Sequence, residues 1–271
     1  MISQAKQKGE RSGAWAEIDA GRRALMKNEI MSLLGKRGIS LFGISEPKEL
    51  AELPAQFSPR SILKDCRSVL CYAAPIPKGI LHAETDSSAL FWRFSNMTYR
   101  FLDTVSNEIC MLLEAQGHLA APIYSCFPWK VCGKKFYGLL PLAYLSQECG
   151  IGKLTRSGLV ANARFGTRLL FGGVITSAAL EKTGKPPDQM CPSDCSLCRE
   201  SCPPGAIDRG GKVDHNLCVR HSGANPLLAH LLADREIKAK FGFDTLLNTV
   251  GVDDHGMYTC SRCLEVCPLN R

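Results

Sequence analysis

The sequence predicts an α+β domain over residues 1–185, followed by a cysteine-rich domain over residues 186–271. In the first part, short apolar runs of strand length alternate with amphipathic runs of helix length. Residues 182–188, rich in Pro, Gly and Lys, then form the clearest linker in the chain. Most of the fourteen cysteines lie beyond this linker, which places the domain boundary there.

The first predicted elements are a helix and two strands. Apolar residues recur at helical spacing over residues 25–34, and Gly35 or Gly38 is placed to end that helix. The runs 39–45 and 68–74 are short and mostly apolar, so they predict buried strands.

A longer helix and further strands follow. The apolar periodicity predicts a helix over residues 98–116, with Gly117 at its C-terminal end. Residues 120–124 predict a short strand. Two apolar runs within residues 159–175 suggest a hairpin whose turn lies near Gly166.

Two cysteine motifs carry the strongest chemical signal. The first reads Cys191-Pro-Ser-Asp-Cys-Ser-Leu-Cys-Arg-Glu-Ser-Cys-Pro203, and the second reads Cys260-Ser-Arg-Cys-Leu-Glu-Val-Cys-Pro268. Each contains C-x2-C-x3-C-P, the end of the bacterial ferredoxin run, in which the last cysteine ligates the neighbouring cluster. The spacing therefore predicts two [4Fe–4S] clusters.

The crossover of the last cysteine defines two thiol sets. The first thiol set, for cluster one, is Cys191, Cys195, Cys198 and Cys267. The second thiol set, for cluster two, is Cys202, Cys260, Cys263 and, as the best candidate for its fourth ligand, Cys218. Two zinc sites with four thiolates each, or simple buried thiols, are the alternatives. We expect the insert 219–259 to be largely helical, with one helix near residues 226–240.

Composition and charge narrow the class of protein. The formal charge of +7 counts every thiol as neutral, whereas bound clusters would be anionic, and Lys and Arg are scattered along the chain. We therefore expect neither DNA nor other nucleic acid as a partner. No apolar run is long enough to span a bilayer, and no signal-peptide pattern is seen, so we expect a cytoplasmic protein without a membrane partner.

Four stretches resemble the epoxyqueuosine reductases and their relatives, the corrinoid-dependent reductive dehalogenases. They are Gly117-His-Leu-Ala-Ala-Pro-Ile123, Leu145-Ser-Gln-Glu-Cys-Gly-Ile-Gly-Lys153, Phe165-Gly-Thr-Arg-Leu-Leu-Phe-Gly-Gly-Val-Ile-Thr176, and the paired cysteine motifs with a terminal Cys-Pro-x-Asn. The resemblance runs from about residue 25 to the C-terminus.

The resemblance implies a nitroreductase-like first domain that holds a corrinoid (cobalamin), and a ferredoxin-like second domain that passes electrons to it, cluster two being nearer. It implies a reductase of a small organic molecule or corrinoid, supplied by a low-potential donor such as a ferredoxin or flavodoxin. Two alternatives remain. One is an electron-transfer protein that reduces another enzyme's corrinoid or cofactor, and the other is an FMN-dependent reductase.

The chain departs from the family where the proton donor is expected. Epoxyqueuosine reductases carry an Asp just after the strand that corresponds to residues 122–124, and this chain has Ser125. A serine is no general acid near neutral pH, so epoxyqueuosine is a doubtful substrate. We expect Tyr137, with Lys134 or Lys135 beside it, to donate the proton instead, because a cation stabilises the phenolate. The alternative is a surface loop with solvated lysines.

Glycines in the second resembling stretch suggest where a flat cofactor would bind. Backbone without a side chain can approach a ring system closely. If a corrinoid binds, we expect it between the loop of Gly150, Gly152 and Gly158 and the turn of Asn162 and Gly166, beside the cysteine-rich domain.

Overall fold

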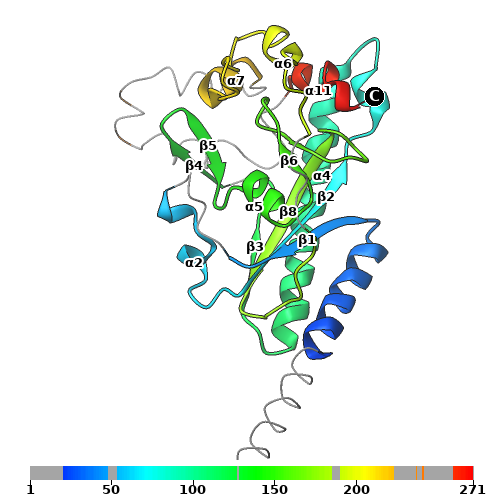
Figure 1. Ribbon diagram of the computed structural model, residues 1–271, viewed down its shortest axis with the longest axis vertical. Helices are drawn as coiled ribbons and strands as arrows, with labels where there is room; N and C mark the ends of the chain where they lie inside the picture. The colour runs from blue at the N-terminus through cyan, green and yellow to red at the C-terminus, as the bar shows by residue number, and fades with distance from the viewer. Residues whose placement is uncertain are drawn as a thin grey trace, which may run out of the picture.

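A four-stranded antiparallel sheet forms the centre of the molecule (Figure 1). The computed structural model describes residues 21–47, 54–126, 128–184, 190–222, 236, 240 and 259–270. The strand order is β1-β2-β8-β3, and the strands are β1 (Leu41–Ser45), β2 (Ser68–Pro75), β8 (Leu169–Thr176) and β3 (Ala120–Ile123). The predicted α+β class therefore holds, with strands close to the predicted bounds 39–45, 68–74 and 120–124.

Two small hairpins and several helices complete the described fold. The hairpins are β4 (Trp129–Cys132) with β5 (Lys135–Gly138), and β6 (Lys153–Leu154) with β7 (Val160–Ala161). The helices are residues 21–36, η1 (Ala55–Phe57), α2 (Pro59–Ile62), α3 (Lys78–Leu81), α4 (Ser87–Ala115), α5 (Leu142–Glu148), α6 (Leu197–Glu200), α7 (His215–Ser222), α11 (Arg262–Glu265) and η2 (Pro268–Asn270). No helix in the described part is long and apolar enough to cross a membrane.

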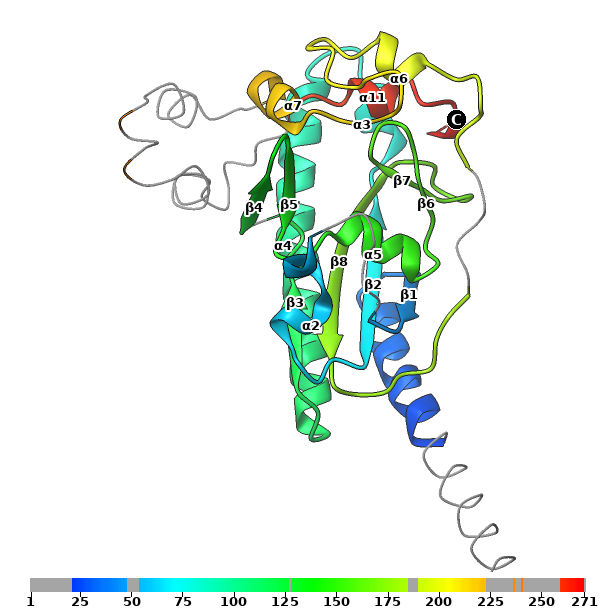
Figure 2. The same ribbon diagram turned by 60° about the vertical axis from the view of Figure 1, so that its left-hand side comes forward.

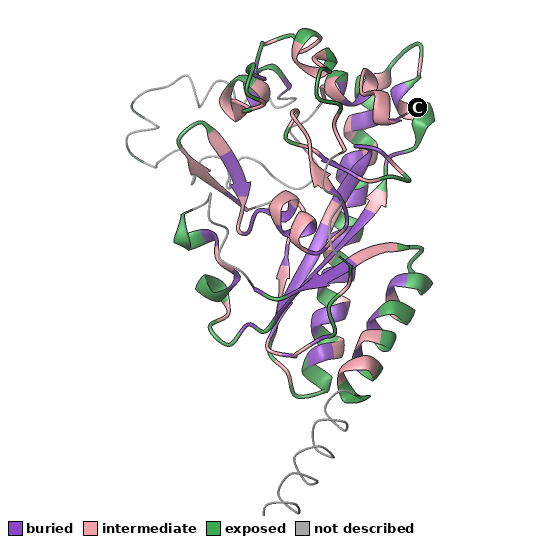
Figure 3. Ribbon diagram, in the orientation of Figure 1, coloured by how far each residue is buried: buried purple, intermediate pink, exposed green. Residues whose placement is uncertain are grey.

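Both faces of the sheet are buried, as the purple strands of Figure 3 show. Side chains alternate along β2, so Leu70 and Tyr72 face the helix 21–36 and α4, whereas Val69 and Cys71 face α5. The predicted helix 25–34 lies within the observed helix 21–36. That helix is followed by Gly38, one of the two glycines expected to end it, whose φ is +74°.

Helix α4 begins eleven residues earlier than the predicted helix 98–116. Its first part buries Ser95, Asn96 and Thr98 together with Phe91, so the buried face there has no apolar periodicity to detect. The C-terminal end is as predicted, since Gly117 adopts a φ of +81° and the next amide bonds back to Leu113.

The predicted hairpin within residues 159–175 is wrong in its pairing. The turn exists, because Asn162 and Gly166 bond to each other through their backbones. The runs on its two sides do not pair, however: β7 pairs with β6, while β8 lies between β2 and β3. A long apolar strand is more stable at the centre of the sheet than in a two-stranded ribbon.

The cysteine-rich lobe repeats one small unit. In the first copy Ser196 stands at the N-cap position of α6 and its hydroxyl donates to the Glu200 carboxylate, and in the second Ser261 and Glu265 do the same at α11. Residues 219–222 of the insert belong to α7. Residues 1–20 and most of the insert lie outside the described residues, and so does the helix expected over 226–240 apart from residues 236 and 240.

Candidate redox site

The first thiol set surrounds one cavity. Cys191, Cys195 and Cys198 from the first motif and Cys267 from the second line it, together with Thr155 and Ser157 of the α+β domain; Pro192, Pro268 and Leu269 complete the lining. The cavity has an empty volume of about 300 Å³, counting the space open to solvent. The chain therefore brings together the four thiols that the crossover rule groups.

The second thiol set lies next to the first. Its members are close enough that the charges of Cys260 and Cys202 act on Cys218, and those of Cys218, Cys260 and Cys202 act on Cys263. Cys202 also accepts a hydrogen bond from the Ala206 amide, with 3.3 Å between N and Sγ. Helix α7 carries Cys218 to the two motifs, although it lies far from both in sequence.

Burial and crowding raise the pKa of three of these thiols, Cys198, Cys218 and Cys263. Burial first, and then neighbouring thiolates, raise the pKa of Cys218 to about 11 and that of Cys263 to about 12. The pKa of Cys198 is raised for the same two reasons. Bound iron would supply the missing positive charge, so cluster binding should release protons.

The spacing of the thiols matters for the choice of metal. Within the described residues, no three His, Cys, Asp or Glu side chains are arranged to hold a single metal ion. Four thiolates on one zinc each lie about 2.3 Å from the metal. A four-iron cube holds its cysteines on separate irons, so they stand further apart. The four thiols of the first set line one cavity.

The C-terminal segment that carries Cys267 is held by buried hydrogen bonds. The Asn270 amide oxygen accepts from the Thr167 N–H at 2.7 Å, and its nitrogen donates to the Leu264 carbonyl at 2.7 Å and to the Thr167 hydroxyl at 3.0 Å. Gly166 is packed so closely here that a β-carbon would overlap Leu269 and Asn270. The turn over residues 162–166 thus packs against the segment that carries Cys267.

Three of the glycines predicted to contact a corrinoid, Gly152, Gly158 and Gly166, pack against other parts of this chain. A β-carbon on Gly152 would overlap the Ala161 carbonyl, and one on Gly158 would press on Val213. Gly166 faces the C-terminal segment. The freedom of these glycines is therefore used within the fold.

The other two residues of the predicted corrinoid site also have roles within the fold. The side chain of Asn162 donates to the Ile151 carbonyl at 2.6 Å and accepts from the Arg164 amide at 2.9 Å. Gly150, with a φ of +79°, follows the C-terminal end of α5. The assignment of these five residues to a corrinoid stays a prediction.

The predicted proton donor lies in the β4–β5 hairpin, and not in a surface loop. Tyr137 is buried on β5, with its ring centroid 4.8 Å from that of Phe57. Lys134 is 79% exposed and pairs with Asp214 at 3.2 Å, so it is not the partner of Tyr137.

A different lysine lies beside Tyr137. Lys130 is directly opposite Tyr137 in the β4–β5 register, and its Nζ stands 5.6 Å from the centroid of the Phe57 ring. Sequence reasoning missed Lys130 because the hairpin was not recognised. The Gly133-Lys134 turn, with a φ of +59° at the glycine, was the available signal.

Asp103 is a second residue that sequence reasoning missed. Its carboxylate on α4 accepts a hydrogen bond from the Ser125 amide at 2.7 Å, which places an acid beside the position where the resembling family carries its own. The Ser125 hydroxyl is buried and has no hydrogen-bond partner among the described residues. Only the tertiary fold joins residues this far apart.

His215 fastens the β4–β5 hairpin to the cysteine-rich lobe. Its Nδ1 accepts a hydrogen bond from the Phe136 amide at 2.9 Å, and its own amide donates to the Lys134 carbonyl at 2.8 Å. Burial, with a smaller contribution from Lys135, lowers the pKa of His215, so the imidazole is neutral in the folded protein.

This arrangement predicts an acid-sensitive fold. The stabilisation that neutral His215 gives to the folded state is complete above the unfolded-state pKa of about 6.5. It is lost as the pH falls from there through the lower pKa of folded His215. Urea unfolding between about pH 8 and pH 5.5 should show a falling free energy of unfolding. His215→Gln, which keeps an acceptor but does not titrate, should flatten that slope. Equal slopes in both proteins would contradict the assignment.

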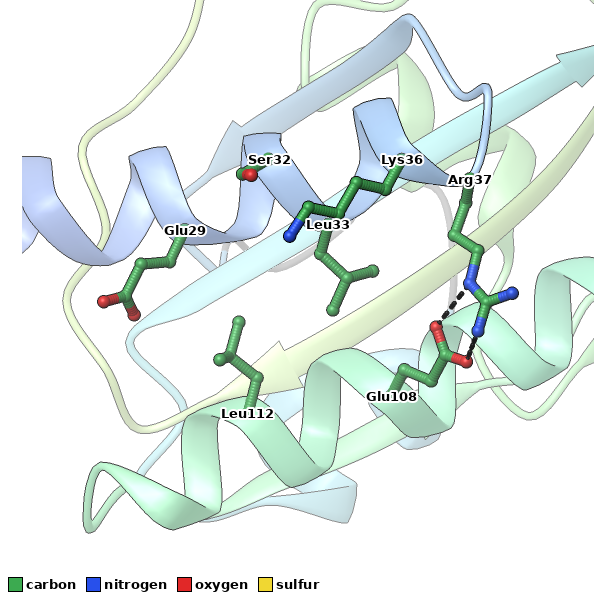
Figure 4. Close-up of a pocket in the computed structure, with 7 residues that line it drawn as sticks. All are labelled: Glu29, Ser32, Leu33, Lys36, Arg37, Glu108 and Leu112. Carbon is green, nitrogen blue, oxygen red and sulfur yellow. Dashed lines mark hydrogen bonds and ion pairs between the residues drawn. The ribbon is translucent and has the colours of Figure 1, made fainter.

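A surface groove lies beside the C-terminal half of α4 (Figure 4). The helix 21–36 and α4 form it, with Arg37 donating to both carboxylate oxygens of Glu108. The remaining lining residues are Glu29, Ser32, Leu33, Lys36 and Leu112. It contains no thiol, so it is separate from the redox site.

Comparisons with known proteins find reductases both among similar sequences and among similar structures. No family model matches the chain. The epoxyqueuosine reductase of Prochlorococcus marinus (strain NATL2A) is 27% identical over 143 residues, which cover 53% of this chain and 40% of the relative. That of Staphylococcus aureus (strain NCTC 8325 / PS 47) is 26% identical over 140 residues, covering 49% and 30%.

Solved structures show the same fold. A selenomethionine-labelled epoxyqueuosine reductase superposes with a TM-score of 0.59 at 16% identity, covering 92% of this chain and 66% of that one. A catabolic reductive dehalogenase in complex with 3-bromo-4-hydroxybenzoic acid gives 0.56 at 15% identity, covering 89% and 31%.

The chain is therefore related to the epoxyqueuosine reductases and shares its fold with them and with reductive dehalogenases, which confirms the predicted resemblance. The particular relatives matched in sequence are all epoxyqueuosine reductases, and the aligned segments span less than half of their length.

Proposed function

We propose that this chain is an iron–sulfur reductase in which two [4Fe–4S] clusters carry electrons to an acceptor beside the α+β domain. The observation that supports this most strongly is the cavity of the first thiol set, where Cys267 joins three cysteines of the other motif. The relatives are reductases by name, and the paired motif is that of two-cluster ferredoxins.

In this proposal the two thiol sets hold one cluster each. Cys191, Cys195, Cys198 and Cys267 ligate cluster one, and Cys202, Cys218, Cys260 and Cys263 ligate cluster two. The two sets adjoin, since Cys198 of the first is close enough for its charge to act on Cys263 of the second. Electrons from a low-potential ferredoxin or flavodoxin would therefore cross a short distance from one cluster to the other.

A corrinoid is the acceptor that the resemblance implies, within a nitroreductase-like first domain. One structural neighbour is described as suggesting a mechanism for B12-dependent dehalogenation. A bound corrinoid would supply a strongly reducing cobalt centre. Gly152 and Gly166, which were predicted to contact the corrinoid, pack against this chain's own residues, so we place no corrinoid there.

The substrate class is set by the acids that the chain offers. Another structural neighbour was solved with an epoxyqueuosine-modified tRNA stem loop. This chain has Ser125 where those enzymes carry an acid, so we propose a small organic substrate. Tyr137 with Lys130, or Asp103 beside Ser125, would supply the proton.

The second candidate function is electron transfer to another enzyme's corrinoid or cofactor. The packing of Gly152 and Gly166 against this chain's own residues supports it. FMN as the acceptor is the third candidate, and it is supported only by the resemblance of the first domain to flavin-binding folds.

One experiment separates these candidates. The anaerobically reconstituted chain is reduced with dithionite, mixed with hydroxocobalamin or with FMN, and desalted. Retained cobalamin with a base-off Co(II) spectrum supports the corrinoid reductase, and retained FMN supports the flavin reductase. Retention of neither by a chain with two reducible clusters supports electron transfer. A chain that takes up no iron would overturn all three.

A further inference from the structure

The tip of the β6–β7 hairpin reaches the cavity of the first thiol set. The tip is a tight turn over residues 155–158, closed by a hydrogen bond from the Gly158 amide to the Thr155 carbonyl at 3.0 Å. Gly158 has a φ of +74°, which a residue with a side chain rarely adopts. Figure 2 shows this hairpin directly beneath α6 and α11.

Arg156 fixes the turn to the first cysteine motif. Its guanidinium donates to the main-chain carbonyls of Ser193 and Cys195. Both carbonyls belong to the segment from Cys191 to Cys195, which carries two cysteines of the first thiol set. Gly211 packs on the other side of Arg156, where a β-carbon would stand 3.2 Å from the Arg156 Cα. Arg156 is therefore fixed by Ser193, Cys195 and Gly211, and this fixes the turn that carries the hydroxyls of Thr155 and Ser157.

One hydroxyl of this turn, that of Ser157, has a proton that is not committed to a main-chain carbonyl. The Thr155 hydroxyl donates to the Leu159 carbonyl at 2.9 Å, and its oxygen lies 3.0 Å from the Ser157 oxygen. A hydroxyl has a single proton, so Thr155 acts only as an acceptor toward Ser157. The Ser157 proton can point to Thr155 or into the cavity, which both residues line together with the four thiols.

We propose that Ser157 donates a hydrogen bond to a sulfur of cluster one and thereby raises the reduction potential of that cluster. The inference rests on the proposed function for the presence of the cluster. Reduction adds a negative charge to the cube, and a donor to its sulfurs stabilises the charged state. The α+β domain would then set the potential of a cluster whose ligands all come from the other domain.

Ser157→Ala tests this in the full reconstituted chain. A redox titration followed by electron paramagnetic resonance should show two one-electron steps in the unaltered protein. Ser157→Ala should move one step to lower potential and leave the other in place, with unchanged iron content. Ser157→Thr, which keeps the hydroxyl, should restore the original value.

Ser201→Ala is the matched control. The Ser201 hydroxyl lies in the cysteine-rich lobe, donates to the Leu197 carbonyl at 2.7 Å and does not line the cavity. It should shift neither step. Two unshifted steps in Ser157→Ala would overturn the inference and leave the proposed function intact. Absence of clusters from the unaltered protein would overturn both.

Discussion

Replacing Cys191 and Cys267 together by serine should leave about four irons per chain, whereas replacing Cys263 and Cys267 together should leave almost none. The first pair belongs to one thiol set, around a single cavity. The second pair lies within one motif but is divided between the two thiol sets, so its replacement removes a ligand from both clusters. Iron and sulfide analysis after anaerobic reconstitution measures the difference.

The matched control is Cys132→Ser, which changes a half-buried thiol on β4 outside both sets and should keep about eight irons. Cys218→Ala should keep about four, because Cys218 is assigned to cluster two alone. If the pair Cys263 and Cys267 kept four irons while the pair Cys191 and Cys267 kept none, the ligands would not cross over and each motif would hold its own cluster.

Gly166→Ala should remove cluster one and spare cluster two. The alanine would sit at a φ of +59° and would overlap Leu269 and Asn270, two and three residues after Cys267. We expect a loss of about 2–5 kcal/mol in the free energy of unfolding, from left-handed strain and overpacking together. About four irons should remain after reconstitution.

Gly117→Ala separates the two causes. Gly117 has a φ of +81°, but nothing lies within 4 Å of its would-be β-carbon. This control carries the strain alone, so it should lose about 1–2 kcal/mol and keep about eight irons. If Gly166→Ala retained both clusters, the contact with the C-terminal segment would not position Cys267.

The thiol sets could be predicted because ligand spacing is a local property of the sequence. Cys191, Cys195 and Cys198 need only one short loop, and the crossover of Cys267 follows from the Cys-Pro ending. The strands β1, β2 and β3 were predictable for a similar reason, since each is one buried apolar run. What lies within a single segment can be read from that segment.

The parts that sequence reasoning missed depend on contacts between distant segments. Lys130 gains its place beside Tyr137 only from the β4–β5 register, and Asp103 reaches Ser125 only across the packed fold. The packing of Gly152 is another such contact. A close approach at Gly152 was expected, but the sequence does not say that Ala161 makes it.

The state of the iron in the unaltered protein tests the central claim most directly. The chain is reconstituted anaerobically with ⁵⁷Fe and sulfide, and its Mössbauer spectrum is recorded together with its iron content. Two four-iron clusters predict about eight irons per chain, all in the quadrupole doublet of oxidised [4Fe–4S] clusters. About two metal ions per chain, or zinc that iron does not displace, would contradict the account, because each thiol set would then hold a single ion.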